Sequence, residues 1–312
     1  MKNKILNIIK ISAISGLIIW AAFKFDMQTA RLALSSAVPL WGILSILTAF
    51  LVIYVISLRW LTIIKGFYGK NRVNIFSLFY FNLLSTFYTL FIPTSIAGEA
   101  VRVVKLSNKT DRVYSKATLV IALDRLLGLL TWFIIFLLSP SPFKNSKYWL
   151  LLLIPAGAIF FFGKKFKFMG HEVFDFSRHH PRDIFYGFMV SFAGQFLVIL
   201  TNFLIIKCFR LNISFFDACG ITAIAALAGI VPLAWLGVSL REGSYLAVLP
   251  MFGASHTQSL LFVSLVVFTT YLLGFTGGVT ELAKSGWDFS KLRKEAEEDI
   301  NIAKGETNGR QN

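Results

Sequence analysis

Long, uninterrupted apolar runs constrain the fold of this chain more than any other feature of its sequence. A helix needs about 20 mainly apolar residues to cross the hydrocarbon core of a bilayer, which is about 30 Å thick. The runs are continuous, unlike the alternating apolar and polar residues of membrane β-barrel strands. The sequence therefore predicts an all-α, polytopic transmembrane helical bundle. The runs are 5–23, 40–58, 76–97, 117–138, 148–162, 185–209, 215–236 and 260–280.

Composition supports the same class and excludes several others. Of the 312 residues, 56% are hydrophobic and 15% charged, and the mean hydropathy is +0.68. The net charge of +15 would suggest nucleic-acid binding in a soluble protein. Here the basic residues gather in short loops between apolar runs, so we expect no nucleic-acid partner. Cys208, Cys219 and the histidines lack the spacing of metal ligands, so we expect no metal and no cofactor.

The basic loops predict which ends of the helices face the cytoplasm. Lysine and arginine are concentrated at 59–73, 102–116 and 163–183, whereas the intervening loops carry two basic residues each. This pattern predicts an inner (cytoplasmic) membrane protein whose N- and C-termini are both cytoplasmic. We expect residues 1–285 to form the transmembrane domain and residues 286–312 a short charged cytoplasmic tail.

Two apolar stretches cannot each be a single crossing of the membrane. Residues 74–101 lie between two basic loops, and one crossing cannot have both ends in the cytoplasm. If the last helix delivers the tail to the cytoplasm, residues 215–253 begin and end on the outer side, which a single crossing cannot do either. Both stretches contain a P-x4-G-x3-R pattern at a common offset of 139 residues, formed by Pro93, Gly98 and Arg102 and by Pro232, Gly237 and Arg241.

Proline and glycine break helices, so each stretch is predicted to turn back as a re-entrant hairpin. Two hairpins that enter from opposite faces are typical of inverted-repeat transporters, whose broken helices meet near the midplane. Irregular backbone at that depth must line a wet cavity or be buried in protein. The alternative is that Pro93 and Pro232 only kink ordinary helices.

Charges inside apolar runs are the candidate functional residues. Asp124 and Arg125 interrupt the run 117–138, although a charge at the bilayer centre costs about 2.5 to 3.5 kcal/mol. If both face the bundle interior, the arginine can bind a lipid phosphate bidentately, and the aspartate can fix the arginine in place or compete for it. Alternatively, Arg125 snorkels to the interface.

A second set of charges follows the two breaks directly. Glu99 and Arg102 follow the first break, and Arg241 and Glu242 follow the second. New helices begin there with unpaired N–H groups that favour anions, so an arginine at this place indicates a phosphate site. Interfacial anchoring is the alternative, and Tyr245 is either a further hydroxyl contact or a packing residue.

Three segments together resemble a known family. Residues 93–106 (PTSIAGEAVRVVKL), 122–128 (ALDRLLG) and 232–249 (PLAWLGVSLREGSYLAVL) are similar to the lysylphosphatidylglycerol synthase transmembrane-domain family, often described as flippase-like. The likeness spans about residues 5–285. It implies a bundle with re-entrant helices that moves or presents anionic or aminoacylated lipids, or polyprenyl-phosphate-linked sugars. The polar landmarks of the family are carried here by Glu99, Arg102, Asp124, Arg125, Arg241 and Glu242.

The chain departs from the family pattern in two ways. Ala97-Gly98 stands in the first break where many relatives have Gly-Gly. The aminoacyl-transfer domain that is fused to this module in lysylphosphatidylglycerol synthases is missing, so we do not expect the chain to synthesise aminoacyl lipid.

The sequence favours a transporter over an enzyme. It contains no Walker loop, HExxH, GxSxG or dinucleotide fingerprint. The leading hypothesis is a flippase or transporter of phosphate-bearing lipids, with membrane lipids as its partners. The alternative is a non-catalytic accessory or scaffold subunit for a lipid-modifying enzyme or cell-envelope glycosyltransferase. The sequence leaves the oligomeric state open.

Overall fold

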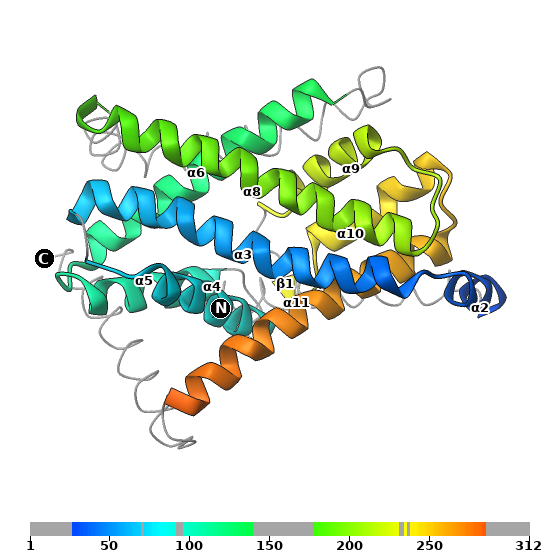
Figure 1. Ribbon diagram of the computed structural model, residues 1–312, viewed down its shortest axis with the longest axis horizontal. Coiled ribbons are helices and arrows are strands. Elements are labelled where there is room, and N and C mark those ends of the chain that lie inside the picture. Colours follow the sequence, from blue (N-terminus) through cyan, green and yellow to red (C-terminus); the bar gives the residue numbers. More distant parts are fainter. Residues whose placement is uncertain are drawn as a thin grey trace, which may run out of the picture.

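In the part of the chain that the computed structural model describes, four long apolar helices form the frame (Figure 1). They contain 25 to 30 residues, about 37 to 45 Å at 1.5 Å per residue, which is enough to cross a bilayer. The predicted polytopic helical bundle is thereby confirmed. The four helices are α3 (Pro39–Tyr68), α6 (Tyr114–Leu138), α8 (Pro181–Cys208) and α11 (His256–Lys284).

The structure describes residues 27–69, 72–91, 96–139, 178–230, 234–235 and 238–284. The predicted runs 5–23 and 148–162 and the predicted tail 286–312 lie outside these residues. A short helix, α2 (Met27–Ser35), precedes α3.

Helices α3 and α8 run side by side through the centre of the bundle (Figure 1). Each begins with a proline, whose fixed φ suits the first helical turn. Gly194 of α8 lies against Val55 and Ile56 of α3, so the two helices approach closely. The Thr201 hydroxyl also donates to that of Thr48 across the contact at 3.0 Å. Small residues and hydroxyl pairs of this kind typically stabilise the packing of membrane helices.

The first broken segment forms a helical hairpin. Helix α4 (Ile75–Phe91) and helix α5 (Ile96–Lys109) are separate helices that pack against each other. With 17 and 14 residues, both are shorter than a full crossing. Pro93 lies outside the described residues. Gly98 lies in the first turn of α5, where a side chain would overlap Ser85 and Thr89 of α4, so it permits the close contact between the two helices.

The second broken segment is also built from short packed helices. Helix α9 (Phe215–Ala228) packs against α10 (Leu240–Val248), which continues into the 3-10 helix η3 (Leu249–Phe252). Between them, β1 (Ala234–Trp235) pairs antiparallel with β2 (Val238–Ser239). This two-residue ladder was not predicted from the sequence. Pro232 and Gly237 lie outside the described residues.

Each hairpin belongs to its own hydrophobic core. One core joins α4 and α5 to α6 and the second half of α3, around Trp60 and Leu84. The other joins α9 and α10 to the end of α8 and the first half of α11, around Ile221 and Phe262. The division into two halves agrees with the two broken segments. That the halves are related as an inverted repeat stays a prediction.

The loop boundaries predicted from charge are wrong at two places. Arg59 and Lys65 were assigned to a loop, but α3 continues through both as far as Tyr68. Arg102 was placed at the start of a basic loop, but it lies within α5, and the connection to α6 covers only residues 110–113. An arginine buried in a helix looks like a loop arginine in the sequence. The carboxylate that neutralises the buried one is seen only in the tertiary structure.

Helix α11 crosses α4 at very short range. The backbone of Gly277 lies directly against that of Leu83 and Leu84, and Gly274 and Gly278 pack on Phe87. Glycine is required here because any side chain would fill the space that the α4 backbone occupies. The ammonium group of Lys105 in α5 also contacts a carboxylate oxygen of Glu281 in α11 at 2.7 Å.

Gly277→Ala should therefore destabilise the protein, whereas Gly194→Ala should not. A methyl at position 277 would overlap the backbone of Leu83, and such overpacking costs about 1 to 3 kcal/mol. A methyl at position 194 would lie 3.7 Å from its nearest neighbour, an ordinary van der Waals distance. Thermal unfolding of both variants in the same detergent checks this. Equal melting temperatures would contradict the close α11–α4 contact.

Candidate functional site

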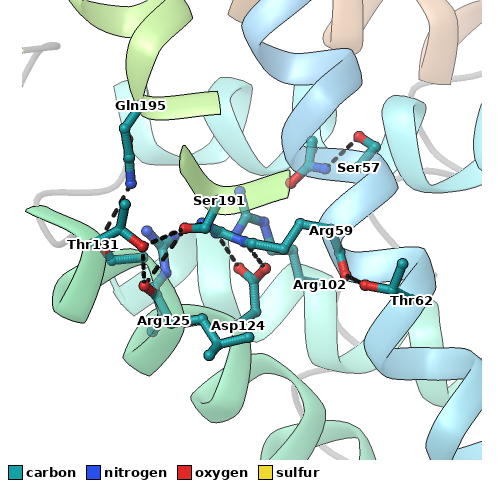
Figure 2. A network of polar contacts seen from close by, with 12 residues as sticks. Ser57, Arg59, Thr62, Arg102, Asp124, Arg125, Thr131, Ser191 and Gln195 are labelled. Carbon is teal, nitrogen blue, oxygen red and sulfur yellow. Dashed lines mark hydrogen bonds and ion pairs between the residues drawn. The ribbon is translucent and has the colours of Figure 1, made fainter. Parts of the chain in front are cut away.

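A buried arginine–aspartate pair lies at the centre of the first half (Figure 2). Arg59 of α3 donates to both carboxylate oxygens of Asp124 in α6, from Nε at 2.7 Å and from Nη2 at 3.0 Å. The side chains are only 7% and 4% exposed. This bidentate geometry is the strongest form of the interaction, and it balances two charges that would be unfavourable alone.

Hydroxyl groups complete the surroundings of the pair. The remaining guanidinium nitrogen, Nη1 of Arg59, donates to Ser191 of α8 at 3.0 Å, and Thr131 of α6 donates to the same hydroxyl. Gln195 donates to the carbonyl oxygen of Gly128 at 3.3 Å. A Cβ atom at Gly128 would lie 3.0 Å from Nη1 of Arg59, so glycine lets the arginine approach α6. Three long helices are thereby tied together by one polar network.

The pair lies at the same depth on both helices. Asp124 follows the first residue of α6, Tyr114, by ten residues, about 15 Å along the axis. Arg59 precedes the last residue of α3, Tyr68, by nine residues, about 14 Å. The pair therefore lies more than two helical turns inside each of these helix ends.

A second cluster surrounds this pair and contains Glu99, Arg102 and Arg125. Arg125 follows Asp124 on α6, and its side chain is 58% exposed. Its guanidinium contacts Oε1 of Glu99 in the first turn of α5. The other oxygen of Glu99, Oε2, lies 3.5 Å from Nη1 of Arg102, whose guanidinium also stacks over the ring of Trp60. Figure 2 shows Arg102 and Arg125 beside the Arg59–Asp124 pair.

The cluster has more positive than negative charge. Three arginines face two carboxylates, which leaves one formal positive charge. Two buried polar atoms also lack a hydrogen-bond partner, Nε of Arg102 and Oε2 of Glu99. Buried polar groups are nearly always hydrogen-bonded, so both atoms could take a further partner.

The charges after the second break form a separate site at the start of α10. The Glu242 carboxylate is buried and accepts from the backbone N–H of Ser239 at 2.7 Å and from Nε of Arg241 at 2.7 Å. Ser239 and Glu242 make a capping box that fixes this helix start. The Arg241 side chain is 41% exposed. No hydrogen bond or ion pair among the described residues joins this site to Arg125.

The structure assigns Tyr245 to packing. It is buried, its hydroxyl accepts from Asn202 of α8 at 2.8 Å, and its ring packs edge-on against Phe262 of α11. Asn202 also donates to Thr222 of α9 at 3.1 Å. This network joins α8, α9 and α10 as the Arg59 network joins α3, α6 and α8.

The structure brings together four of the six predicted site residues. Glu99, Arg102, Asp124 and Arg125 form one cluster, and no hydrogen bond or ion pair among the described residues joins Arg241 and Glu242 to it. Asp124 is held by Arg59, which the sequence had assigned to a loop. The signal that could have identified Arg59 is its position one turn before Ile63 and Ile64, in an apolar stretch that continues beyond it.

Comparison with protein families gives one match. The model of the lysylphosphatidylglycerol synthase transmembrane region matches residues 7–278, which is most of the chain. The chain belongs to this family. Comparisons with curated proteins and with solved structures gave no match. Membership of the lysylphosphatidylglycerol synthase transmembrane-region family indicates a lipid-related function in the membrane, and the matched range contains both charged sites.

A metal site finds no support in the part of this family member that the structure describes. In those residues, histidine, cysteine, aspartate and glutamate do not gather in groups of three or more. The carboxylates of the two sites are instead engaged by arginines.

Asp124→Asn should destabilise the fold strongly. It leaves Arg59 buried without its counter-ion, and breaking such a pair costs about 3 to 5 kcal/mol. The double variant Arg59→Met with Asp124→Leu should recover much of this loss, because both charges disappear together. Thermal unfolding in detergent measures both effects.

Asp111→Asn is the matched control. Asp111 pairs with Lys116 at 3.5 Å, but both side chains are more than a third exposed, so the change should be within about 0.5 kcal/mol. If Asp124→Asn were no more damaging than Asp111→Asn, the Arg59–Asp124 pair would not be the stabilising contact described here.

Proposed function

We propose that this protein is a flippase-like transporter that binds phosphate-bearing lipids at Arg125 and moves their headgroups across the inner membrane. The observation that carries the proposal is the exposed guanidinium of Arg125 about halfway along an apolar helix that is long enough to span the bilayer. Charged residues at such a depth are costly and as a rule serve a function. An anionic headgroup is the partner that a lipid membrane supplies.

The chemistry of the cluster suits a phosphate. A guanidinium presents two parallel N–H groups that match two phosphate oxygens. Arg125 is exposed, whereas Arg59 uses all three of its nitrogens on Asp124 and Ser191. In this proposal Arg125 binds the headgroup, Arg102 adds positive charge from α5, and Glu99 orients both. The Arg59–Asp124 pair holds α6 in position.

The acidic residues favour transport over chemistry. A general base needs a carboxylate that is free to take a proton, but Glu99, Asp124 and Glu242 each contact an arginine. We therefore assign them positioning roles. Arg241 is proposed as a second headgroup contact, because it is half-exposed and lies at the start of α10, where unpaired N–H groups favour anions.

The architecture suggests how a headgroup could move while its acyl chains stay in lipid. The two short-helix hairpins belong to different cores, and in this proposal the two halves move relative to each other. Alternating access of this kind is the usual mechanism of transporters with two repeats. Cytoplasmic N- and C-termini, as the loop charges predict, are part of the proposal.

Arg125→Ala should lower at least tenfold the rate of headgroup translocation of a fluorescent anionic phospholipid in vesicles reconstituted with the full chain. Loss of one charge-assisted contact costs about 1.5 to 3 kcal/mol, which corresponds to at least a tenfold lower rate. Arg182→Ala is the control, since Arg182 is exposed in the first turn of α8, away from both sites. Unchanged translocation by a folded Arg125→Ala variant would contradict the proposed site.

Arg241→Ala should lower translocation in the same assay without changing the lipids retained at Arg125. The two arginines lie in separate sites, so their effects on binding should be independent. Native mass spectrometry of the purified variants measures the retained lipids. A protein that moves no lipid but co-purifies with a glycosyltransferase would instead support an accessory role.

A further inference from the structure

The net charge of the residues around Arg125 bears on the charge of the headgroup that the site would bind. The cluster comprises Arg59, Arg102 and Arg125 against Glu99 and Asp124. Asp124 pairs with Arg59, Glu99 pairs with Arg102 and Arg125, and Figure 2 shows these two arginines beside the Arg59–Asp124 pair. Its formal charge is therefore +1. A ligand with one negative charge would make the occupied site neutral, which is the least costly state in an apolar environment.

Neighbouring charges do not alter this balance. The nearest lysine on α5, Lys105, is paired with Glu281 of α11 at 2.7 Å. Arg241 is paired with Glu242 in the other half. Both carboxylates are thus engaged by cations outside the cluster, and the cluster keeps its own count of three arginines against two carboxylates.

Glu99 is the residue that sets the balance. Asp124 is fully engaged by Arg59 and is nearly inaccessible, so its charge is part of the frame. Glu99 lies between the two other arginines, with Oε1 on Arg125 and Oε2 3.5 Å from Arg102. It is partly exposed, and Oε2 has no hydrogen bond. Its charge is therefore the one that a bound phosphate would meet directly.

We infer that Glu99 makes the Arg125 site selective for lipids with a single negative charge, such as phosphodiesters, over lipids with a doubly charged phosphomonoester or pyrophosphate. The inference rests on the proposed function of the site and deepens it. A dianion at the same position would leave one negative charge uncompensated beside the Glu99 carboxylate. Two negative charges in direct contact repel strongly when water is excluded.

The test compares two lipids with identical acyl chains. Phosphatidylglycerol carries one negative charge, and phosphatidic acid carries close to two above neutral pH, because the second pKa of a phosphomonoester is about 6. The full-length protein is incubated with an equimolar mixture in mildly alkaline buffer. Native mass spectrometry then gives the ratio of the two retained lipids.

The wild-type protein should retain phosphatidylglycerol in preference. Glu99→Gln keeps the shape but raises the site charge to +2, and one uncompensated charge should change the ratio about tenfold or more toward phosphatidic acid. Glu99→Asp keeps the charge and should keep the wild-type ratio. The double variant Glu99→Gln with Arg102→Gln returns the charge to +1 and should restore the preference for phosphatidylglycerol.

Three results would overturn the inference: equal retention by the wild type, an unchanged ratio in Glu99→Gln, or loss of both lipids from a folded Glu99→Gln variant. If Glu99→Gln does not fold, the wild-type ratio and the double variant decide. Failure of the inference is distinct from failure of the proposed function, in which Arg125→Ala would retain and move lipid as the wild type does.

Discussion

The ion pair between Arg59 and Asp124 is the interaction on which the first half of this protein depends. It places two full charges deep in an apolar bundle, where neither would be stable without the other. Because its partners lie on α3, α6 and α8, the pair fixes the relative position of three long helices. It also decides which arginine is available to a ligand. Arg59 is fully used, and Arg125, the next residue after Asp124, is left exposed.

The same constraint explains why the site was only partly predictable. Apolar runs identified the long helices, and the two Pro/Gly patterns identified both hairpins, because these features depend on local sequence. Glu99, Arg102, Asp124 and Arg125 were recognised as charges in unusual places. Their partners could not be read from the sequence. Arg59 lies 65 residues from Asp124 in the chain, and a pairing over that separation is set by tertiary packing.

The arginines named from the sequence do not all share the same partners. Arg102 and Arg125 share Glu99, but Arg241 forms its own ion pair at the start of α10. The two P-x4-G-x3-R segments have equal spacing in the sequence. The local structures differ, because a capping box and a β-ladder precede α10, whereas Gly98 packs the first turn of α5 against α4. A shared pattern in sequence thus serves two different helix starts.

Helix α11 connects the two halves. Near its beginning, Phe262 packs on Tyr245 of α10, and near its end, Gly277 lies against the backbone of α4. Helix α11 is continuous and contains no proline between these two contacts, so both hairpins pack on one helix. The two halves also touch directly, since α9 packs on α6 and β1 lies against α4. A rearrangement that opens one half tilts α11, and the other half must rearrange with it. Coordination between the halves therefore needs no contact between the two charged sites.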